Sequence, residues 1–336
     1  MSARFNILSL SGGGYLGLYS AKVLSLLEEL TGGKPIARSS ELLAGTSVGG
    51  IIALGLAAEV EASKILSAFK ERGPLIFPDR PEMTSKLGMA KYLWKYGRIA
   101  KYTSDALRET IEELLPHKDM KLGDLSHRVI IPAVNLSTGA PRVFKTPHKE
   151  NITYDARLRV VDVALATSAA PTFLPMSELN GALHADGGLF ANAPDILALH
   201  EAEHFLHQDV SLIHMLSIGT TTSKFSFSHK TGRNFGPIQW MKGQRLIKAM
   251  MASQQKSVEF MISHRLQERY LRLDEEQSPE QNADLALDAA TPHAISTLMA
   301  LGEQTGKEAR AMDAVIEFLH HDAPAAGFFG DINGSM

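Results

Sequence analysis

Two short apolar segments near the N-terminus each end in glycine and lead directly into a helical pattern. Residues 5–10 (FNILSL) precede the glycine-rich stretch SGGGYLG at 11–17, and residues 15–30 carry apolar side chains at helical spacing. Residues 41–45 (ELLAG) are a second apolar run, followed by an apolar helix at 48–58. Repeated strand–turn–helix units of this kind predict an α/β fold with a mainly parallel central sheet and helices on both faces.

The rest of the chain continues this alternation without a visible linker. Further strands are predicted at residues 128–135, 142–145, 182–186 and 211–218, and helices at about 64–121, 160–168, 194–207 and 238–273. Loops are predicted at 223–236 and 277–282, and two short helices bring the chain to residue 320. We expect one domain over residues 1–320, with a motif-bearing core at about 5–220, a helical part at about 238–320 and a mobile tail at 321–336.

The composition excludes several kinds of function. The 336 residues carry a net charge of −3, which gives no overall basis for binding nucleic acid. The chain contains no cysteine, so disulfides, thiolate catalysis and cysteine-ligated metals are excluded. The N-terminus lacks the apolar core of a signal peptide, and the apolar stretch at 42–58 is shorter than the roughly 20 residues that span a bilayer. We therefore expect a cytoplasmic protein.

The five residues Gly45-Thr46-Ser47-Val48-Gly49 fit the pattern G-x-S-x-G at the point where a buried strand turns into a helix. A serine on such a tight turn presents its hydroxyl from a strained backbone, and the flanking glycines relieve the crowding. The helix that follows also directs its first N–H groups at charge that develops near the serine. A chance match in a glycine-rich turn is the alternative, and the strand–helix context favours a nucleophile.

The glycine-rich stretch after the first strand contains G-x-G-x-x-G at Gly12, Gly14 and Gly17. A dinucleotide-binding turn would need an acidic residue at the end of the second strand to hold the ribose. Ser47 follows that end, whereas Glu41 stands at the beginning of the strand. The loop is therefore predicted to present backbone N–H groups to a transient oxyanion beside the serine.

Asp186 in HADGGLFANAP follows a predicted strand and precedes Gly187 and Gly188. Burial beside a serine would raise its pKa above the ordinary value near 3.9 and allow it to accept the hydroxyl proton. Asp-Gly is also a common turn dipeptide, so Asp186 taken alone would be read as a turn residue.

Together the three loops resemble the patatin-like phospholipases, and the blocks SAAPTFLP at 168–175 and SIGT at 217–220 match as well. The resemblance implies a three-layer patatin-like fold and metal-independent, cofactor-free hydrolysis of fatty-acyl esters. It implies a Ser–Asp dyad, with Ser47 as nucleophile and Asp186 as base. It further implies an oxyanion loop at Gly12, Gly13, Gly14 and Gly17, and motif glycines at Gly45, Gly49, Gly187 and Gly188.

The sequence departs from the family pattern at two loop positions. Ser11 stands where the family often has Asp, and Leu16 where it often has a basic residue. These departures put in doubt a cation beside the oxyanion, but the backbone donors do not depend on one.

A closer resemblance covers more of the chain. LSLSGGGYLGLYSAKVLSLLE, GTSVGGIIALGLA and LDAATPHAISTLMALGE look like the patatin-like effectors of bacterial anti-phage signalling systems. This resemblance implies activation by a cyclic dinucleotide such as cGAMP and degradation of membrane phospholipid at the inner face of the membrane. An esterase without nucleotide control, and a nucleotide-binding module with an inactive site, remain alternatives. The oligomeric state, the headgroup and sn-position preferences and the nucleotide's binding residues stay open.

Two further patterns have competing interpretations. HEAEH at 200–204 fits a zinc-protease signature, but His200, His204 and His207 lie opposite an apolar stripe and are better explained as the solvated face of an amphipathic helix. The segment at 86–102 interleaves lysines and an arginine with tyrosines and a tryptophan. It suits an anionic membrane surface, a cyclic dinucleotide or an ordinary helical cap over the active site.

Overall fold

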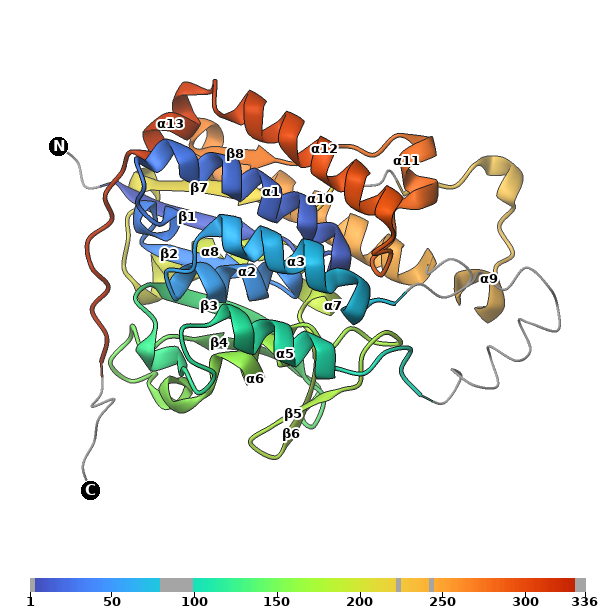
Figure 1. The fold of residues 1–336 in the computed structure, drawn as a ribbon, viewed down its shortest axis with the longest axis horizontal. Coiled ribbons are helices and arrows are strands. Elements are labelled where there is room, and N and C mark those ends of the chain that lie inside the picture. Colours follow the sequence, from blue (N-terminus) through green and yellow to red (C-terminus); the bar gives the residue numbers. More distant parts are fainter. Residues whose placement is uncertain (1–3, 79–98, 222–224, 242–244, 330–336) are drawn as a thin grey trace.

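The described residues contain one mixed sheet of eight strands (Figure 1). The computed structural model describes residues 4–78, 99–221, 225–241 and 245–329. Pairing connects the strands in the sequence β5-β6-β3-β2-β1-β7-β8, and β4 also pairs with β3. The strands are β1 Phe5–Leu10, β2 Leu42–Gly45, β3 Arg128–Asn135, β4 Ala140–Lys145, β5 Ser177–Leu179, β6 Ala182–Asp186, β7 Ile213–Ile218 and β8 Tyr270–Leu273.

Helices cover both faces of the sheet, so the molecule has three layers (Figure 1). One face packs against α1 Gly17–Glu28, α2 Val48–Ala57, α3 Ala62–Ile76, α5 Asp105–Leu114, α6 Val160–Thr167, α12 Pro292–Ala309 and α13 Asp313–Leu319. The other packs against α8 Asp195–His200 and α10 Arg245–Leu266. The short helices are α7 Gly188–Ala191, α9 Pro237–Met241 and α11 Pro279–Asp284. The predicted α/β fold is confirmed.

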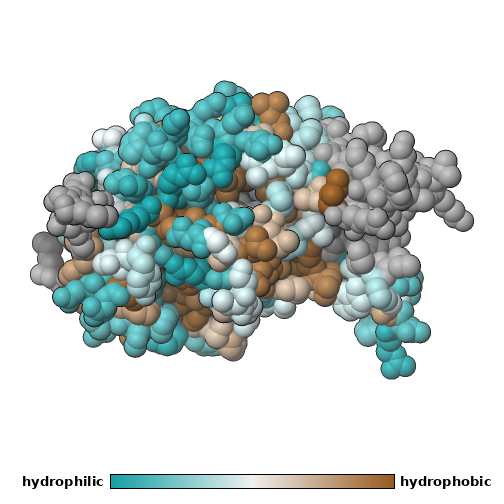
Figure 2. All heavy atoms as spheres, turned by 90° about the horizontal axis from the view of Figure 1, so that it is seen from below, coloured by the Kyte–Doolittle hydropathy of each residue, from teal (hydrophilic) through white to brown (hydrophobic). Residues whose placement is uncertain are grey.

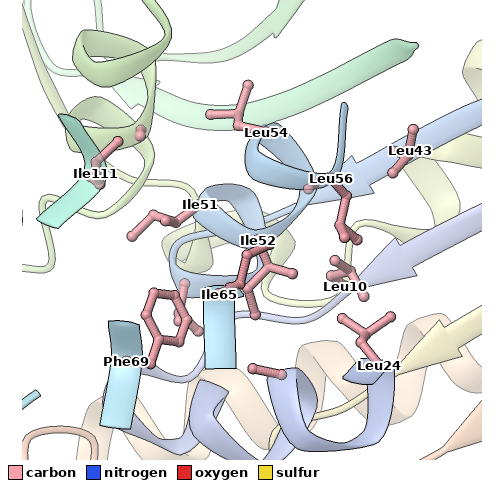
Figure 3. Packing of buried hydrophobic residues seen from close by; sticks show 14 of the residues in the cluster. Leu10, Leu24, Leu43, Ile51, Ile52, Leu54, Leu56, Ile65, Phe69 and Ile111 are labelled. Carbon is pink, nitrogen blue, oxygen red and sulfur yellow. The ribbon is translucent and has the colours of Figure 1, made fainter. Parts of the chain in front are cut away.

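Alternation along the central strands explains the two apolar cores. On β1, Leu8 and Leu10 face one core while Phe5 and Ile7 face the other. Helix α2 is buried along its whole length, because it lies between the sheet and the helices α1 and α3 (Figure 3). A helix that is apolar on every side is stable only in such a position.

A gap on one side of β3 brings two strand ends together. Strand β2 pairs in parallel with the first half of β3, where Ala44 lies opposite Ile130. Strand β6 pairs antiparallel with the second half, where Asp186 lies opposite Ala133. Strand β4 pairs with residues 130–135 of β3 and so overlaps the β2 pairing at Ile130 and the whole β6 pairing. It therefore occupies the other side of β3, and β2 and β6 share one side and run towards each other. Pro132, which has no N–H to donate, lies at the gap between them.

The C-terminal part differs from the sequence prediction in two ways. The helix expected at 238–273 ends at Leu266, and Tyr270–Leu273 forms the edge strand β8, parallel to β7. Gln267 adopts a positive φ of 52° there, which a continuing helix does not allow. The segment expected to be a loop at 277–282 includes most of α11, which begins with a capping box made by Ser278 and Gln281.

The helix expected at 194–207 is also interrupted. Helix α8 ends at His200 and continues as a π-helical turn at Glu201–Phe205. Glu201 is buried, and its carboxylate accepts hydrogen bonds from Lys145 at 2.6 Å and from His148 at 2.9 Å. His200 and His204 stack on each other at the surface. Glu201, the glutamate of the H-E-x-x-H pattern, is therefore bound within an interior charge cluster.

The C-terminal segment, the basic segment at 86–102 and the apolar stretch at 42–58 remain to be compared with the sequence predictions. Residues 321–329 have no regular secondary structure, and the N–H groups of Ala323 and Phe329 donate to the carbonyls of Arg38 and Pro147. Most of the basic, aromatic segment at 86–102 lies outside the described residues. Within the described part of the chain, no helix combines the length and the apolar character needed to cross a membrane. The apolar stretch at 42–58 forms β2 and α2.

Replacement of Ile52 by alanine tests the importance of α2. Ile52 has no solvent-exposed surface and lies at the centre of the larger core (Figure 3). We expect Ile52→Ala to lower the free energy of unfolding by about 2–5 kcal/mol and Ile52→Val by about 0.5–1.5 kcal/mol, because a cavity remains. Urea denaturation followed by circular dichroism measures both. An alanine variant as stable as the wild type would contradict this packing.

Candidate active site

Ser47 lies on the turn that links β2 to α2, as the G-x-S-x-G pattern predicts. Its backbone has φ 55° and ψ −125°, a conformation that residues with a side chain rarely adopt. The turn is held from outside the motif, since the N–H of Ser47 donates to the hydroxyl of Thr167 at 3.0 Å. Thr167 in turn donates to the carbonyl of Pro132 at 2.6 Å. Thr167 therefore fills the gap beside β3 and fixes the turn.

The hydroxyl of Ser47 donates a hydrogen bond to Asp186 Oδ2 at 2.6 Å. The other carboxylate oxygen, Oδ1, accepts the N–H of Gly188 at 2.7 Å. Both side chains are buried, at 7% and 6% exposure. The two residues lie 139 positions apart in the chain and meet because β2 and β6 end opposite each other along β3.

Burial changes the acidity of the Asp186 carboxyl. Loss of hydration raises its pKa to about 6, while the hydrogen bonds from Ser47 and Gly188 lower it by a smaller amount. No cation of the described residues contributes to this shift. A carboxylate with a pKa of about 6 is ionised at neutral pH and is a stronger base than an aspartate in water.

The glycine loop lies beside Ser47, and some of its N–H groups already donate hydrogen bonds within the protein. The N–H of Gly12 donates to the carbonyl of Asn192 at 2.9 Å, and that of Gly17 donates to the carbonyl of Gly14. Among the described residues, no partner is found for the N–H groups of Gly13 and Gly14. Of the four predicted loop glycines, these two can donate to an oxyanion.

Close packing explains why glycine stands at the motif positions. A Cβ atom would lie 3.0 Å or less from a neighbouring atom at Gly12, Gly13, Gly14, Gly17, Gly45, Gly49, Gly187 and Gly188. Gly14 is the clearest case, because its φ is +55° and its Cβ would lie 2.2 Å from the carbonyl oxygen of Leu287. The N–H of Tyr15 donates to that same carbonyl at 2.8 Å, so the loop is fastened to the segment after α11.

A largely buried cation lies behind the glycine loop although Leu16 occupies the usual basic position. Arg272 on β8 donates to the hydroxyl of Ser11 at 3.0 Å and to that of Ser217 at 2.7 Å, and it pairs with Asp274 at 2.8 Å. The sequence did not point to Arg272, because its segment continues a helical pattern. Three further residues hold the turn and the loop: Thr167, Asn192 and Thr220. The sequence around the turn and the loop does not indicate them, because they lie on distant elements.

An apolar pocket opens at the serine. Ser47 and Asp186 lie in its wall together with side chains of α2, α3, α5 and the N-terminal half of α10. Phe69, Phe173 and Met250 are among its apolar lining residues. A pocket with few polar groups beside one reactive hydroxyl suits a hydrocarbon chain that ends in an ester.

Two alternative sites find no support in the geometry. Glu41 accepts the N–H of Asn6 at 2.6 Å, which places its carboxylate at the end of the sheet opposite the glycine loop. Across the described ranges, no group of three or more histidine, aspartate or glutamate side chains could hold a metal ion.

The fold and the pocket define the class: an α/β acyl hydrolase with a serine on a strand–helix turn. The family model described as patatin-like phospholipase matches residues 8–199. The chain belongs to this family, and it is a serine-type, lipid-hydrolysing esterase.

Similar proteins come from three bacteria. A cGAMP-activated phospholipase of Pseudomonas aeruginosa is 38% identical, covering 99% of this chain and 97% of the relative. A protein of the same description from Vibrio cholerae is 35% identical, covering 90% of each chain. One from Escherichia coli is 36% identical, covering 90% of this chain and 88% of the relative. The similarity therefore extends through the C-terminal part, beyond the family model.

The raised pKa of Asp186 predicts a pH profile. Protonated Asp186 cannot accept the serine proton, so kcat/KM should fall about tenfold per pH unit below a midpoint near pH 6. Hydrolysis of a soluble p-nitrophenyl ester between pH 4.5 and 8.5 measures this limb. A midpoint near pH 4, the ordinary range of aspartate, would contradict the burial argument.

The same burial predicts a gain of stability in Asp186→Asn. Because the folded-state pKa is raised above the unfolded value of 3.8, folding favours the protonated form, and the charged form destabilises the native state as the pH rises from about 4 to about 6. We expect Asp186→Asn to be inactive yet more stable than the wild type at pH 8, with a difference that shrinks towards pH 4. Urea denaturation at both pH values measures it; an equal difference at both would contradict the linkage.

Proposed function

We propose that this protein hydrolyses fatty-acyl esters of membrane phospholipids through a Ser47–Asp186 dyad and is switched on by a cyclic dinucleotide. The observation that carries the proposal is the 2.6 Å hydrogen bond from the Ser47 hydroxyl to a buried Asp186 carboxylate at the end of an apolar pocket. The proposal uses no third residue, because burial raises the pKa of Asp186 and makes its carboxylate a stronger base than an aspartate in water.

Acylation begins when the acyl chain enters the apolar pocket and its ester carbonyl reaches Ser47. The Ser47 oxygen attacks the carbonyl carbon as its proton moves to Asp186. The oxyanion accepts hydrogen bonds from the free N–H groups of Gly13 and Gly14, and one such donor is worth about 10²–10³ in rate. When the intermediate collapses, the carbon–oxygen bond to the glycerol breaks and Asp186 returns its proton to the leaving alcohol.

Deacylation repeats these steps with water. Asp186 accepts a proton from the water that attacks the acyl-Ser47 ester, and the same two N–H groups stabilise the second oxyanion. Collapse releases the fatty acid and returns the proton from Asp186 to Ser47. The dyad thus ends each cycle in its starting protonation state.

The control by a nucleotide is supported by the relatives, three of which are described as cGAMP-activated phospholipases. Membrane lipid as substrate is supported by the apolar pocket and by the hydrophobic residues that gather on the face shown in Figure 2 towards the end that carries α9. We infer that the enzyme acts at the inner face of the membrane in anti-phage defence.

Removal of either dyad member tests the mechanism. Purified protein is given vesicles of phosphatidylethanolamine and phosphatidylglycerol, with and without cGAMP, and released fatty acid is measured. Wild-type hydrolysis should rise with cGAMP, while Ser47→Ala and Asp186→Asn should each lose at least about 10⁴-fold in kcat, because dyad members act as a unit.

The outcomes separate the alternatives. Hydrolysis that persists in Ser47→Ala would overturn the mechanism. Full wild-type activity without nucleotide would indicate an esterase without nucleotide control. Binding of cGAMP by a protein that hydrolyses neither phospholipid nor a soluble ester would indicate a nucleotide-binding module with an inactive site.

A further inference from the structure

A second groove shares a wall with the apolar pocket. Gly13, Asn192, Met251 and Leu287 line both hollows, so the glycine loop separates them. The second groove continues between the N-terminal half of α10 and the segment from residue 277 to residue 287. The mechanism proposed above makes no use of it.

The groove carries a larger share of polar groups than the pocket, although apolar side chains line it as well. Its lining includes residues with polar side chains, among them Thr220, Thr221, Lys248, Gln255, Gln277 and Asn282. No aspartate or glutamate lines it among the described residues. A half-enclosed groove with a cation, hydroxyls and amides is suited to a phosphate group.

Gln277 leaves one polar atom without a partner. Its side chain is only 7% exposed, and its Nε2 donates to the hydroxyl and the carbonyl of Thr221. These bonds fix the orientation of the amide, because only the NH₂ group can donate. Its Oε1 is buried and accepts no hydrogen bond from any described residue. A buried acceptor without a donor is unfavourable, and a ligand that displaces the surrounding groove wall can supply the missing N–H.

Two neighbouring residues are also in unusual states. Lys248 on α10 is partly buried, and none of the described carboxylates forms an ion pair with it. Thr221 has a positive φ of 67°, which is rare for a β-branched residue, and its N–H is held by Asp274 at 3.0 Å. Within the described chain, a cation without an ion pair, an acceptor without a donor and a strained residue therefore line one groove.

Direct hydrogen bonds connect this groove to the glycine loop. The hydroxyl of Thr220 donates to the carbonyl of Gly12 at 2.9 Å. On the opposite side, the carbonyl of Leu287 accepts the N–H of Tyr15 at 2.8 Å. A ligand that binds between Thr220 and Leu287 must act on both attachments of the loop that presents Gly13 and Gly14.

We propose that this groove binds a phosphodiester, with Lys248 on the phosphate and Gln277 Oε1 accepting an N–H of the group that the phosphate carries. Two phosphodiesters fit this chemistry: a cyclic dinucleotide, through a base N–H, and a phospholipid headgroup, through an amine. This inference rests on the proposed function, which supplies both candidate ligands: the activating nucleotide and the phospholipid substrate. Occupation of the groove orders the glycine loop and aligns its two free N–H groups.

Calorimetry without lipid tests the nucleotide source. cGAMP is titrated into wild-type protein, Lys248→Met, Gln277→Leu and the control Lys256→Met, whose lysine lies on the same helix, outside the groove, and pairs with Glu259. We expect Lys248→Met and Gln277→Leu each to weaken binding at least tenfold and Lys256→Met to bind like the wild type. Thermal melts report folding, and Lys248→Met alone decides the outcome if Gln277→Leu does not fold.

Kinetics test the lipid source. Initial rates are measured for the same proteins on vesicles of phosphatidylethanolamine and phosphatidylglycerol and on the phosphate-free substrate p-nitrophenyl butyrate. If the groove holds the headgroup, Lys248→Met should raise KM for the vesicles at least fivefold and leave KM for the soluble ester unchanged.

The calorimetric and kinetic experiments distinguish the two occupants. An altered cGAMP affinity identifies the nucleotide as the occupant, and an altered vesicle KM alone identifies the headgroup. If neither quantity changes more than twofold in Lys248→Met, the groove proposal is wrong, even where the wild type remains a cGAMP-activated phospholipase. Failure of the proposed function is seen in the wild type, which would then release no fatty acid from the vesicles.

Discussion

The hydrogen bond between Ser47 and Asp186 depends on the way three strands meet. Strand β3 extends beyond the end of β2, and β6 uses the remaining part of the same side in the opposite direction. The two strand ends therefore point at each other across a gap that contains Pro132 and the Thr167 hydroxyl. A parallel strand in place of β6 would place the aspartate at its far end. The antiparallel pairing is the constraint from which the geometry of the dyad follows.

The carboxylate of Asp186 stays buried without a neighbouring cation in the described part of the chain because the structure around it is rigid. Among the described residues, Asp186 accepts only a serine hydroxyl and one backbone N–H, so its charge is stabilised less than it would be in water. That unfavourable burial is borne by the rigid surroundings: a fully buried α2 on one side and a core that covers both faces of the sheet. Basicity at the site and stability of the fold are therefore in opposition at Asp186.

Local patterns predict the elements whose signal lies within the element. Residues 5–10 and 48–58 are predictable because their apolar spacing and flanking glycines are sufficient evidence. The strand–helix turn points to Ser47, whereas Asp186, the last residue of β6, is assigned as the base through the family resemblance. Strand β8 was not predicted, since its four residues continue the apolar pattern of α10 and are distinguished only by pairing with β7. Arg272 was not predicted for the same reason. Its guanidinium group, hydrogen-bonded to Ser11, is a cation next to the loop in which Leu16 replaces the usual basic residue. Such contacts depend on tertiary pairing, which no local pattern encodes.

The glycine loop has the sequence pattern of a dinucleotide-binding turn, but its contacts in the structure differ from those of such a turn. A dinucleotide turn presents its N–H groups to a permanent pyrophosphate at a helix N-terminus. Here Gly12 and Gly17 use their N–H groups within the protein, and among the described contacts only Gly13 and Gly14 remain free beside Ser47. The loop instead forms the wall between the apolar pocket and the second groove. Its attachments at Gly12 through Thr220 and at Tyr15 through Leu287 connect the loop to the lining of the groove, and the proposed ligand would act through these two hydrogen bonds.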